Sequence, residues 1–91
     1  MKVHVRVTKT DIKEGVPEST SYCPIARALE RRHPRRTAEV GINGDEVYIY
    51  EAARAYIATL PLEACDFIHA FDAGELVEPF AFDMDFEREN G

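Results

Sequence analysis

The chain has 91 residues, near the lower limit for an ordinary domain, so we expect a single domain over residues 1–91 with a modest core. Hydrophobic residues make up 45% of the chain, but no apolar run approaches the roughly 18 residues of a membrane-spanning helix, which excludes an embedded protein of that kind. The N-terminus alternates apolar and charged residues and lacks the apolar stretch of a secretory signal. We therefore expect a cytoplasmic protein in which Cys23 and Cys65 are free thiols.

The net charge of −6 is divided unevenly along the chain. Residues 1–60 carry ten Lys or Arg and eight acids, a balance of +2, whereas residues 61–91 carry one Arg and nine acids, a balance of −8. This asymmetry bears on solubility and on the choice of partner rather than on the fold.

The first third of the chain predicts a strand and two helical segments. Residues 2–8 place valines on one side and mainly charged side chains on the other, with the period of two of a half-buried strand. Residues 11–15 predict a single helical turn that ends at its glycine. A longer helix is expected over residues 22–32, because apolar side chains recur at spacings of three and four until Pro34 ends the pattern.

The middle of the chain predicts a hairpin. Residues 37–42 and 46–50 are the two strand patterns, and the Asn43-Gly44 pair between them suits a tight turn. Residues 51–60 are compatible with a helix, because of their alanines, or with a further strand. The extended conformation is favoured.

The last third predicts one helix and one strand. Pro61 suits the first turn of a helix, and Gly74 suits its C-terminal cap. Residues 80–86 alternate large apolar side chains with alanine and aspartate, so one face of this strand is expected to lie against helices. Residues 87–91 are expected to form a frayed tail.

The order strand, helix, hairpin, helix, strand predicts an α+β fold. We expect a two-layer sandwich in which two helices cover one face of an antiparallel or mixed sheet of four to five strands. A ferredoxin-like arrangement is the nearest familiar topology.

Two groups of residues form a pattern that extends over nearly the whole chain. The first group is Thr8, Asp11, Ile12, Gly15, Ser19 and the run Cys-Pro-Ile-Ala-Arg-Ala-Leu at 23–29. The second group is Leu60, Pro61, Glu63, Ala64, Phe67, Ile68, Phe71, Asp72, Gly74, Val77 and the run Pro-Phe-Ala-Phe at 79–82. This pattern resembles small uncharacterised proteins of actinobacterial tailed phages and prophages. The resemblance implies an accessory protein of unknown role, in the cytoplasm of a bacterial host, with no activity to carry over.

The most localised chemical feature is a basic cluster at the end of the first long helix. It consists of Arg27, Arg31, Arg32, Arg35 and Arg36. Guanidinium groups donate paired hydrogen bonds to phosphates or carboxylates, so the cluster could bind nucleic acid or an acidic protein surface. Alternatively, these cations only favour the helix dipole and remain solvated.

An acidic face is expected on the last strand. Asp83 and Asp85 alternate with the apolar residues, and Glu87 follows them. Such a face could dock on a basic host protein or mimic a nucleic acid backbone. Alternatively, it is a solvated surface that prevents an edge strand from aggregating.

Support for catalysis is thin. Cys23 with a histidine could supply a nucleophile and a base, and Asp72 with Asp83 or Asp85 could form a carboxylate pair, but the sequence fixes neither arrangement. Metal-ligand spacings and glycine-rich phosphate loops are absent from the sequence. We therefore expect neither an enzyme nor a bound metal or cofactor.

Tyrosines in the middle of the chain supply a further candidate surface. Tyr48, Tyr50 and Tyr56 could form a homodimer or partner interface, or could simply cover an open sheet face.

We expect a non-enzymatic accessory protein that binds a host or phage macromolecule, with a protein favoured over nucleic acid. The alternatives are a nucleic-acid-associated module that uses the arginine cluster and a small self-assembling structural subunit.

Overall fold

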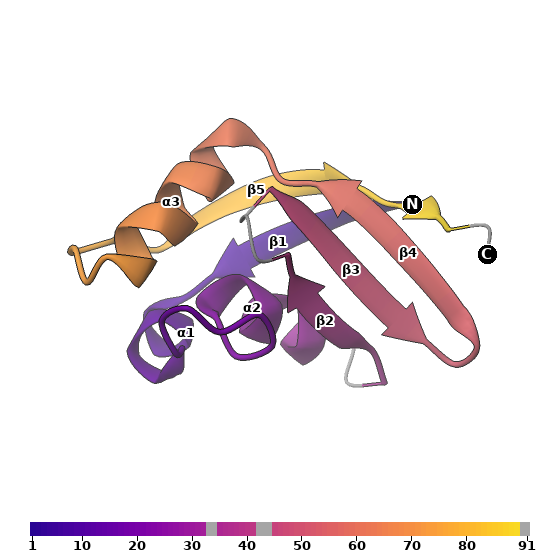
Figure 1. Cartoon of the computed structure of the whole chain (residues 1–91), viewed down its shortest axis with the longest axis horizontal. Coiled ribbons are helices and arrows are strands. Elements are labelled where there is room, and N and C mark those ends of the chain that lie inside the picture. The colour runs from indigo at the N-terminus through magenta and orange to yellow at the C-terminus, as the bar shows by residue number, and fades with distance from the viewer. Residues whose placement is uncertain (33–34, 42–44, 90–91) are drawn as a thin grey trace.

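The computed structural model describes residues 1–32, 35–41 and 45–89, which form an α+β fold (Figure 1). In chain order the elements are β1 (Lys2–Val7), α1 (Lys9–Glu14), α2 (Pro24–Arg32), β2 (Thr37–Val40), β3 (Glu46–Glu51), β4 (Arg54–Thr59), α3 (Leu62–Asp72), β5 (Phe80–Asp85) and β6 (Glu87–Arg88). Strand β4 confirms the extended conformation favoured for residues 51–60. The hairpin turn expected at Asn43-Gly44 and the helix stop at Pro34 lie outside the described residues.

The strands form two antiparallel sheets. One sheet contains β1 and β5, and the other has the order β2-β3-β4-β6. The expected α+β class and antiparallel pairing are confirmed, and the finer arrangement is two sheets rather than one. The hairpin pairs with β4 and not with β1, so the strand order is not that of a single ferredoxin-like sheet.

The last stretch of extended chain links the two sheets. Strand β5 pairs with β1, and this pairing continues one residue further, where the Phe86 amide donates to the Met1 carbonyl (2.7 Å) and the Met1 ammonium donates to the Phe86 carbonyl (2.8 Å). Strand β6 then pairs with β4. The chain therefore passes from one sheet to the other at Phe86, which is 1% exposed.

The expectation of a frayed tail is wrong for residues 87–89. Glu87 and Arg88 form β6, and the amide of Glu89 donates to the carbonyl of Ala55 (2.9 Å). These residues carry no apolar side chain that would reveal the pairing in the sequence. Their order comes from the backbone of β4 and from the buried Phe86 before them.

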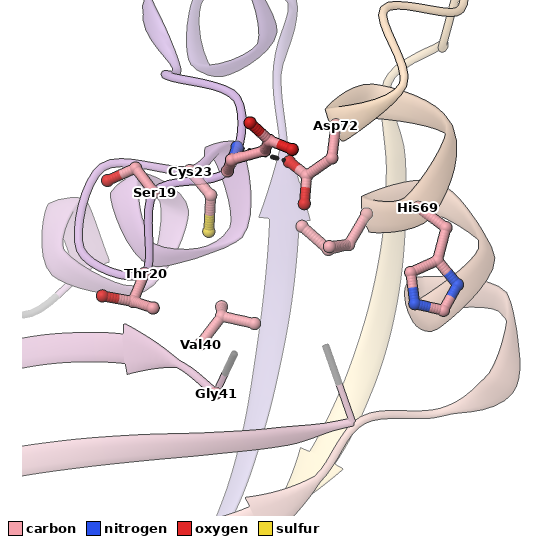
Figure 2. A pocket seen from close by; sticks show the side chains of 9 residues that line it. Ser19, Thr20, Cys23, Val40, Gly41, His69 and Asp72 are labelled. Carbon is pink, nitrogen blue, oxygen red and sulfur yellow. Dashed lines mark hydrogen bonds between the residues drawn. The ribbon is translucent and has the colours of Figure 1, made fainter. Parts of the chain in front are cut away.

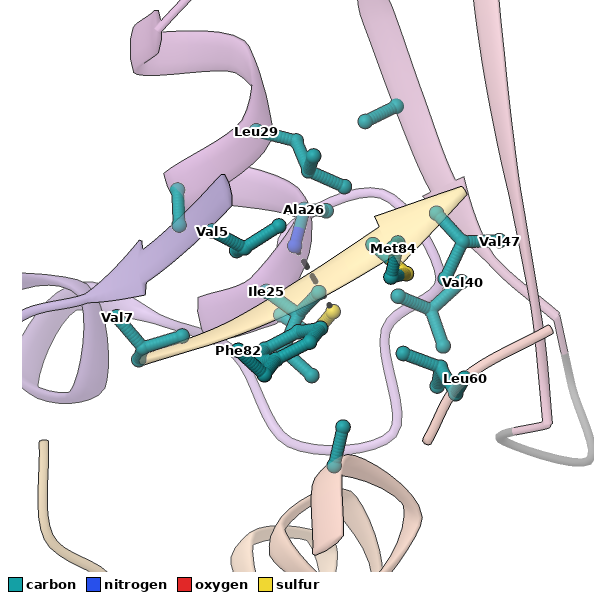
Figure 3. Packing of buried hydrophobic residues seen from close by; sticks show 14 of the residues in the cluster. Val5, Val7, Ile25, Ala26, Leu29, Val40, Val47, Leu60, Phe82 and Met84 are labelled. Carbon is teal, nitrogen blue, oxygen red and sulfur yellow. Dashed lines mark hydrogen bonds between the residues drawn. The ribbon is translucent and has the colours of Figure 1, made fainter. Parts of the chain in front are cut away.

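The core lies between the inner face of the β1–β5 sheet, the helices α2 and α3, and the β2–β3 hairpin. Figure 3 shows Val5 and Val7 of β1 and Phe82 and Met84 of β5 packed beside Ile25 of α2. Helix α3 joins the same cluster through Phe67, whose ring centroid lies 4.7 Å from that of Phe80. Burial of these apolar side chains is the main contribution that favours folding.

Helix α2 lies between β1 and β2 and also covers the free edge of β2. The amide of Ala38 donates to the Glu30 carboxylate of α2 (3.2 Å). The amide of Val40 donates to the carbonyl of Thr20, in the loop before α2 (2.8 Å). Both outward-facing amides of this edge strand are therefore satisfied, and the edge is closed to further pairing.

Among the helices of the described residues, none has both the length and the apolar character required to cross a bilayer.

Candidate functional site

Two arginines of the basic cluster pack against helix α1. Asp11 is 1% exposed, and its carboxylate accepts hydrogen bonds from Arg31 and from the amide of Thr8 (2.9 Å), while the Thr8 hydroxyl caps α1 in return. Arg27 donates to Glu14 (2.7 Å). These contacts join α1 to α2, so these two guanidinium groups have a structural role.

Three arginine side chains make contacts outside α1. Arg31 and Arg32 donate to the carbonyls of Arg6 (2.9 Å) and His4 (3.1 Å), on the free edge of β1. Arg36 donates to the Glu51 carboxylate of β3 (3.1 Å). Arg35 is exposed. Four of the five arginines therefore make intramolecular contacts, directed at three different elements, which leaves less of the cluster available to an external phosphate.

The acidic residues of β5 lie on the outer face of the β1–β5 sheet. The Asp83 carboxylate lies 2.8 Å from the Nδ1 atom of His4, and the Asp85 carboxylate lies 3.2 Å from the Met1 ammonium group. Glu87 is exposed on β6. The three residues expected to form an acidic face are thus neighbours on the surface, and two of them contact a nitrogen group on β1 or at its N-terminal end.

A groove of about 360 Å³ runs between β4 and β5, and we call it the acidic groove. Its lining residues are Glu46, Ile57, Ala58, Thr59, Asp83, Met84, Asp85 and Glu87. Four carboxylates therefore surround the partly exposed Ile57, and the nearly buried Ala58 and Met84 lie at the base of the groove. A shape of this kind can hold the apolar stem of a lysine or arginine while its charged end meets a carboxylate.

Sequence reasoning identified three of these carboxylates and missed Glu46. This residue begins β3 and lies opposite Thr59 of β4 in the antiparallel register. The only signal in the sequence is the alternation of Glu46, Tyr48 and Tyr50, which places Glu46 on an outer face. That it lines the same groove as residues of β5 depends on how the two sheets meet, which the local pattern does not encode.

A second cavity, of about 250 Å³, brings Cys23 and His69 into one lining (Figure 2). The Cys23 thiol accepts a hydrogen bond from the Ala26 amide (3.5 Å), so it acts as a cap for α2, and Asp72 accepts one from the Glu18 amide (2.8 Å). Burial raises the pKa of the Cys23 thiol above its ordinary value. A protonated, nearly inaccessible thiol is a poor nucleophile.

The three tyrosines do not share one surface. Tyr48 and Tyr50 stack on the outer face of β3, with ring centroids 6.4 Å apart, and the neighbouring Glu46 carboxylate is the main reason that the pKa of Tyr48 is raised. Tyr56 is partly buried and packs against the core. Any interface formed by this part of the chain would therefore use Tyr48 and Tyr50 without Tyr56.

Within the described ranges, no group of three or more His, Cys, Asp or Glu side chains is arranged to hold a metal ion. Comparisons with known proteins gave no match: no family model fits the chain, and no curated protein and no solved structure is significantly similar to it. The resemblance to phage and prophage proteins stays a prediction.

Proposed function

We propose that this protein is a non-enzymatic accessory protein that binds a basic segment of another protein in the acidic groove. The observation that carries the proposal is that four carboxylates from three strands line one groove together with the partly exposed Ile57. In line with the phage resemblance, we place the partner among host or phage proteins in the bacterial cytoplasm.

Electrostatics favour a cationic ligand. Asp83 lies beside the His4 imidazole and Asp85 pairs with the Met1 ammonium group, whereas Glu46 and Glu87 form no ion pair with the described residues. The whole chain also carries a net charge of −6. Complementary charge accelerates encounter and rejects acidic partners more strongly than it adds affinity.

Nucleic acid is the weaker candidate as a ligand. Four of the five arginines that would bind phosphates donate instead to Asp11, Glu14, Glu51 and the β1 backbone. A phosphate backbone approaching the acidic groove would also be repelled. A steep loss of nucleic acid binding with added salt would be the sign of this alternative.

The test measures the affinity of a fluorescent lysine-rich peptide for wild-type protein and two charge-matched variants. Glu46→Gln with Glu87→Gln removes two carboxylates of the groove, and Asp66→Asn with Glu75→Gln removes two exposed carboxylates that do not line it. Glu46→Gln with Glu87→Gln removes two exposed ion pairs with the peptide, so it should weaken binding about fivefold. The other variant should not weaken binding.

The result that would overturn the proposal is an equal change for both variants, which would indicate attraction to the net charge alone. The absence of measurable binding to wild-type protein would also overturn it. Circular dichroism of both variants checks that the fold is retained.

A further inference from the structure

The backbone of β5 presents a free edge to the acidic groove. Met1 and Phe86 exchange two hydrogen bonds, so they are a hydrogen-bonded pair of the antiparallel ladder. In such a ladder, alternate residues direct their amide and carbonyl groups to the same neighbour. Met84 therefore faces β1 as Phe86 does, and the backbone groups of Asp83 and Asp85 point to the opposite side, toward the groove.

The backbone of β4 presents a second free edge to the same groove. The amide of Leu60 donates to the carbonyl of Asp45, so even-numbered residues of this strand face β3. The Ala55 carbonyl accepts from the Glu89 amide, so the backbone groups of odd-numbered residues point away from β3. Thr59 therefore faces the groove, beyond the end of the short β4–β6 ladder. In the described part of the chain, no strand pairs with Thr59 from this side.

The outer edges of β1 and β2 are covered. Arg31 and Arg32 donate to the β1 edge, and Glu30 and the Thr20 carbonyl accept from the β2 edge. Among the contacts of the described residues there is no comparable cover on the groove side of β5. Since unpaired strand edges are templates for another strand, folds normally protect them, and an edge left open beside a groove is suited to a ligand.

We propose that the acidic groove binds its ligand as an added strand: a short, extended, lysine- or arginine-bearing segment of a protein, paired with the β5 edge at Asp83 and Asp85. This inference rests on the proposed function, and it adds the conformation of the bound segment. Main-chain hydrogen bonds hold the segment, and alternate side chains of the added strand reach the carboxylates of the outer face.

The charge of the groove selects the strand that can be added. The carboxylates of Asp83, Asp85 and Glu87 repel the same edge of a second copy of this chain, so self-pairing is disfavoured. A segment with lysine or arginine at alternate positions removes this repulsion. Its side-chain stems cover Ile57, which is partly exposed on the outer face of β4.

The experiment compares two peptides with the same charge: a short peptide of alternating lysine and threonine, and the same peptide with N-methyl groups on its backbone amides. N-methylation removes main-chain donors and leaves the charges unchanged. We expect the methylated peptide to bind at least about tenfold more weakly. We also expect the unmethylated peptide to slow hydrogen exchange at the amides of Asp83 and Asp85, with no change at the Val40 amide.

Each outcome has a distinct meaning. Weaker binding of the methylated peptide, with protection at Asp83 and Asp85, supports the added strand. Equal affinity of the two peptides overturns the added strand and leaves the proposed function standing. If neither peptide binds, both proposals fail, and if Glu46→Gln with Glu87→Gln leaves the affinity unchanged, the peptide binds elsewhere and the groove is the wrong site.

Discussion

A single buried carboxylate connects several residues of the N-terminal half. Asp11 accepts from the Thr8 amide and from Arg31, and its own carbonyl accepts from the Gly15 amide (2.8 Å). A β-carbon on Gly15 would lie 2.7 Å from that carbonyl oxygen and 2.8 Å from the ring of Pro24. Four positions of the phage-like pattern, at 8, 11, 15 and 24, thus have structural explanations, and the pattern describes packing more than a binding site.

Replacing the Asp11 carboxylate should destabilise the fold. Asp11→Asn removes the buried negative charge beside Arg31 and weakens the hydrogen bond to Thr8, so the free energy of unfolding is expected to fall by about 2 kcal/mol. Urea unfolding measures the change. Asp66→Asn, at an exposed carboxylate, serves as the control and should change the stability by less than about 0.5 kcal/mol. Similar values for the two variants would show that Asp11 is not a structural centre.

The Cys23 thiol predicts an alkaline loss of stability. Because burial raises its pKa, the folded protein keeps this proton at pH values where the unfolded chain releases it. The associated stability is complete below the unfolded pKa of about 8.5 and is lost as the pH rises toward the folded pKa. Cys23→Ala lowers the absolute stability, so the slope between neutral pH and about pH 10 is the quantity to measure. It should be shallower in the variant, and identical slopes would rule this explanation out.

At the scale of elements, α2 serves as a cover for two sheet edges. Its C-terminal arginines reach the β1 carbonyls, and its Glu30 accepts from the β2 amide of Ala38. Side-chain cover of this kind explains why an exposed helix end carries so many long charged residues. It also explains why their partners could not be predicted, since helical periodicity identifies the face of a helix but not the strand beside it.

Removing one of these covers should have a local effect. Glu30→Ala leaves the Ala38 amide without its acceptor, so its hydrogen exchange should accelerate about tenfold. The Val40 amide donates to the backbone carbonyl of Thr20 instead, and provides an internal control that should not change. Faster exchange at both amides would mean that the variant loosens the whole edge, against the specific role assigned to Glu30.

The alternation of residues 80–86 predicted a strand with one buried face, and Phe82, Met84 and Phe86 are buried as expected. Such local patterns also predicted the helices and the hairpin strands. They could not predict the division into two sheets, because a period of two gives the faces of a strand and not its neighbours. The acidic groove depends on that division, and so only part of its lining could be recognised from the sequence.

At the scale of the whole molecule, the strand that runs from β5 into β6 joins the two sheets. Deleting residues 87–91 should remove the β6 pairing with β4 and lower the free energy of unfolding by about 1–3 kcal/mol, as expected for a few backbone hydrogen bonds. Deleting residues 90–91 alone is the control. If the two truncated proteins were equally stable in urea, β6 would contribute nothing to the junction.

The pairing of β1 with β5 joins residues 2–7 to residues 80–85, at nearly the full length of the chain. During synthesis, β1 is made long before its partner, and its valines have no sheet to complete until residues 80–85 have been added. This pairing of segments that are distant in the sequence gives the sheet a high contact order, which predicts slow folding. Before β5 has been made, Arg31 and Arg32 can already donate hydrogen bonds to the β1 carbonyls and so cover one edge of this strand.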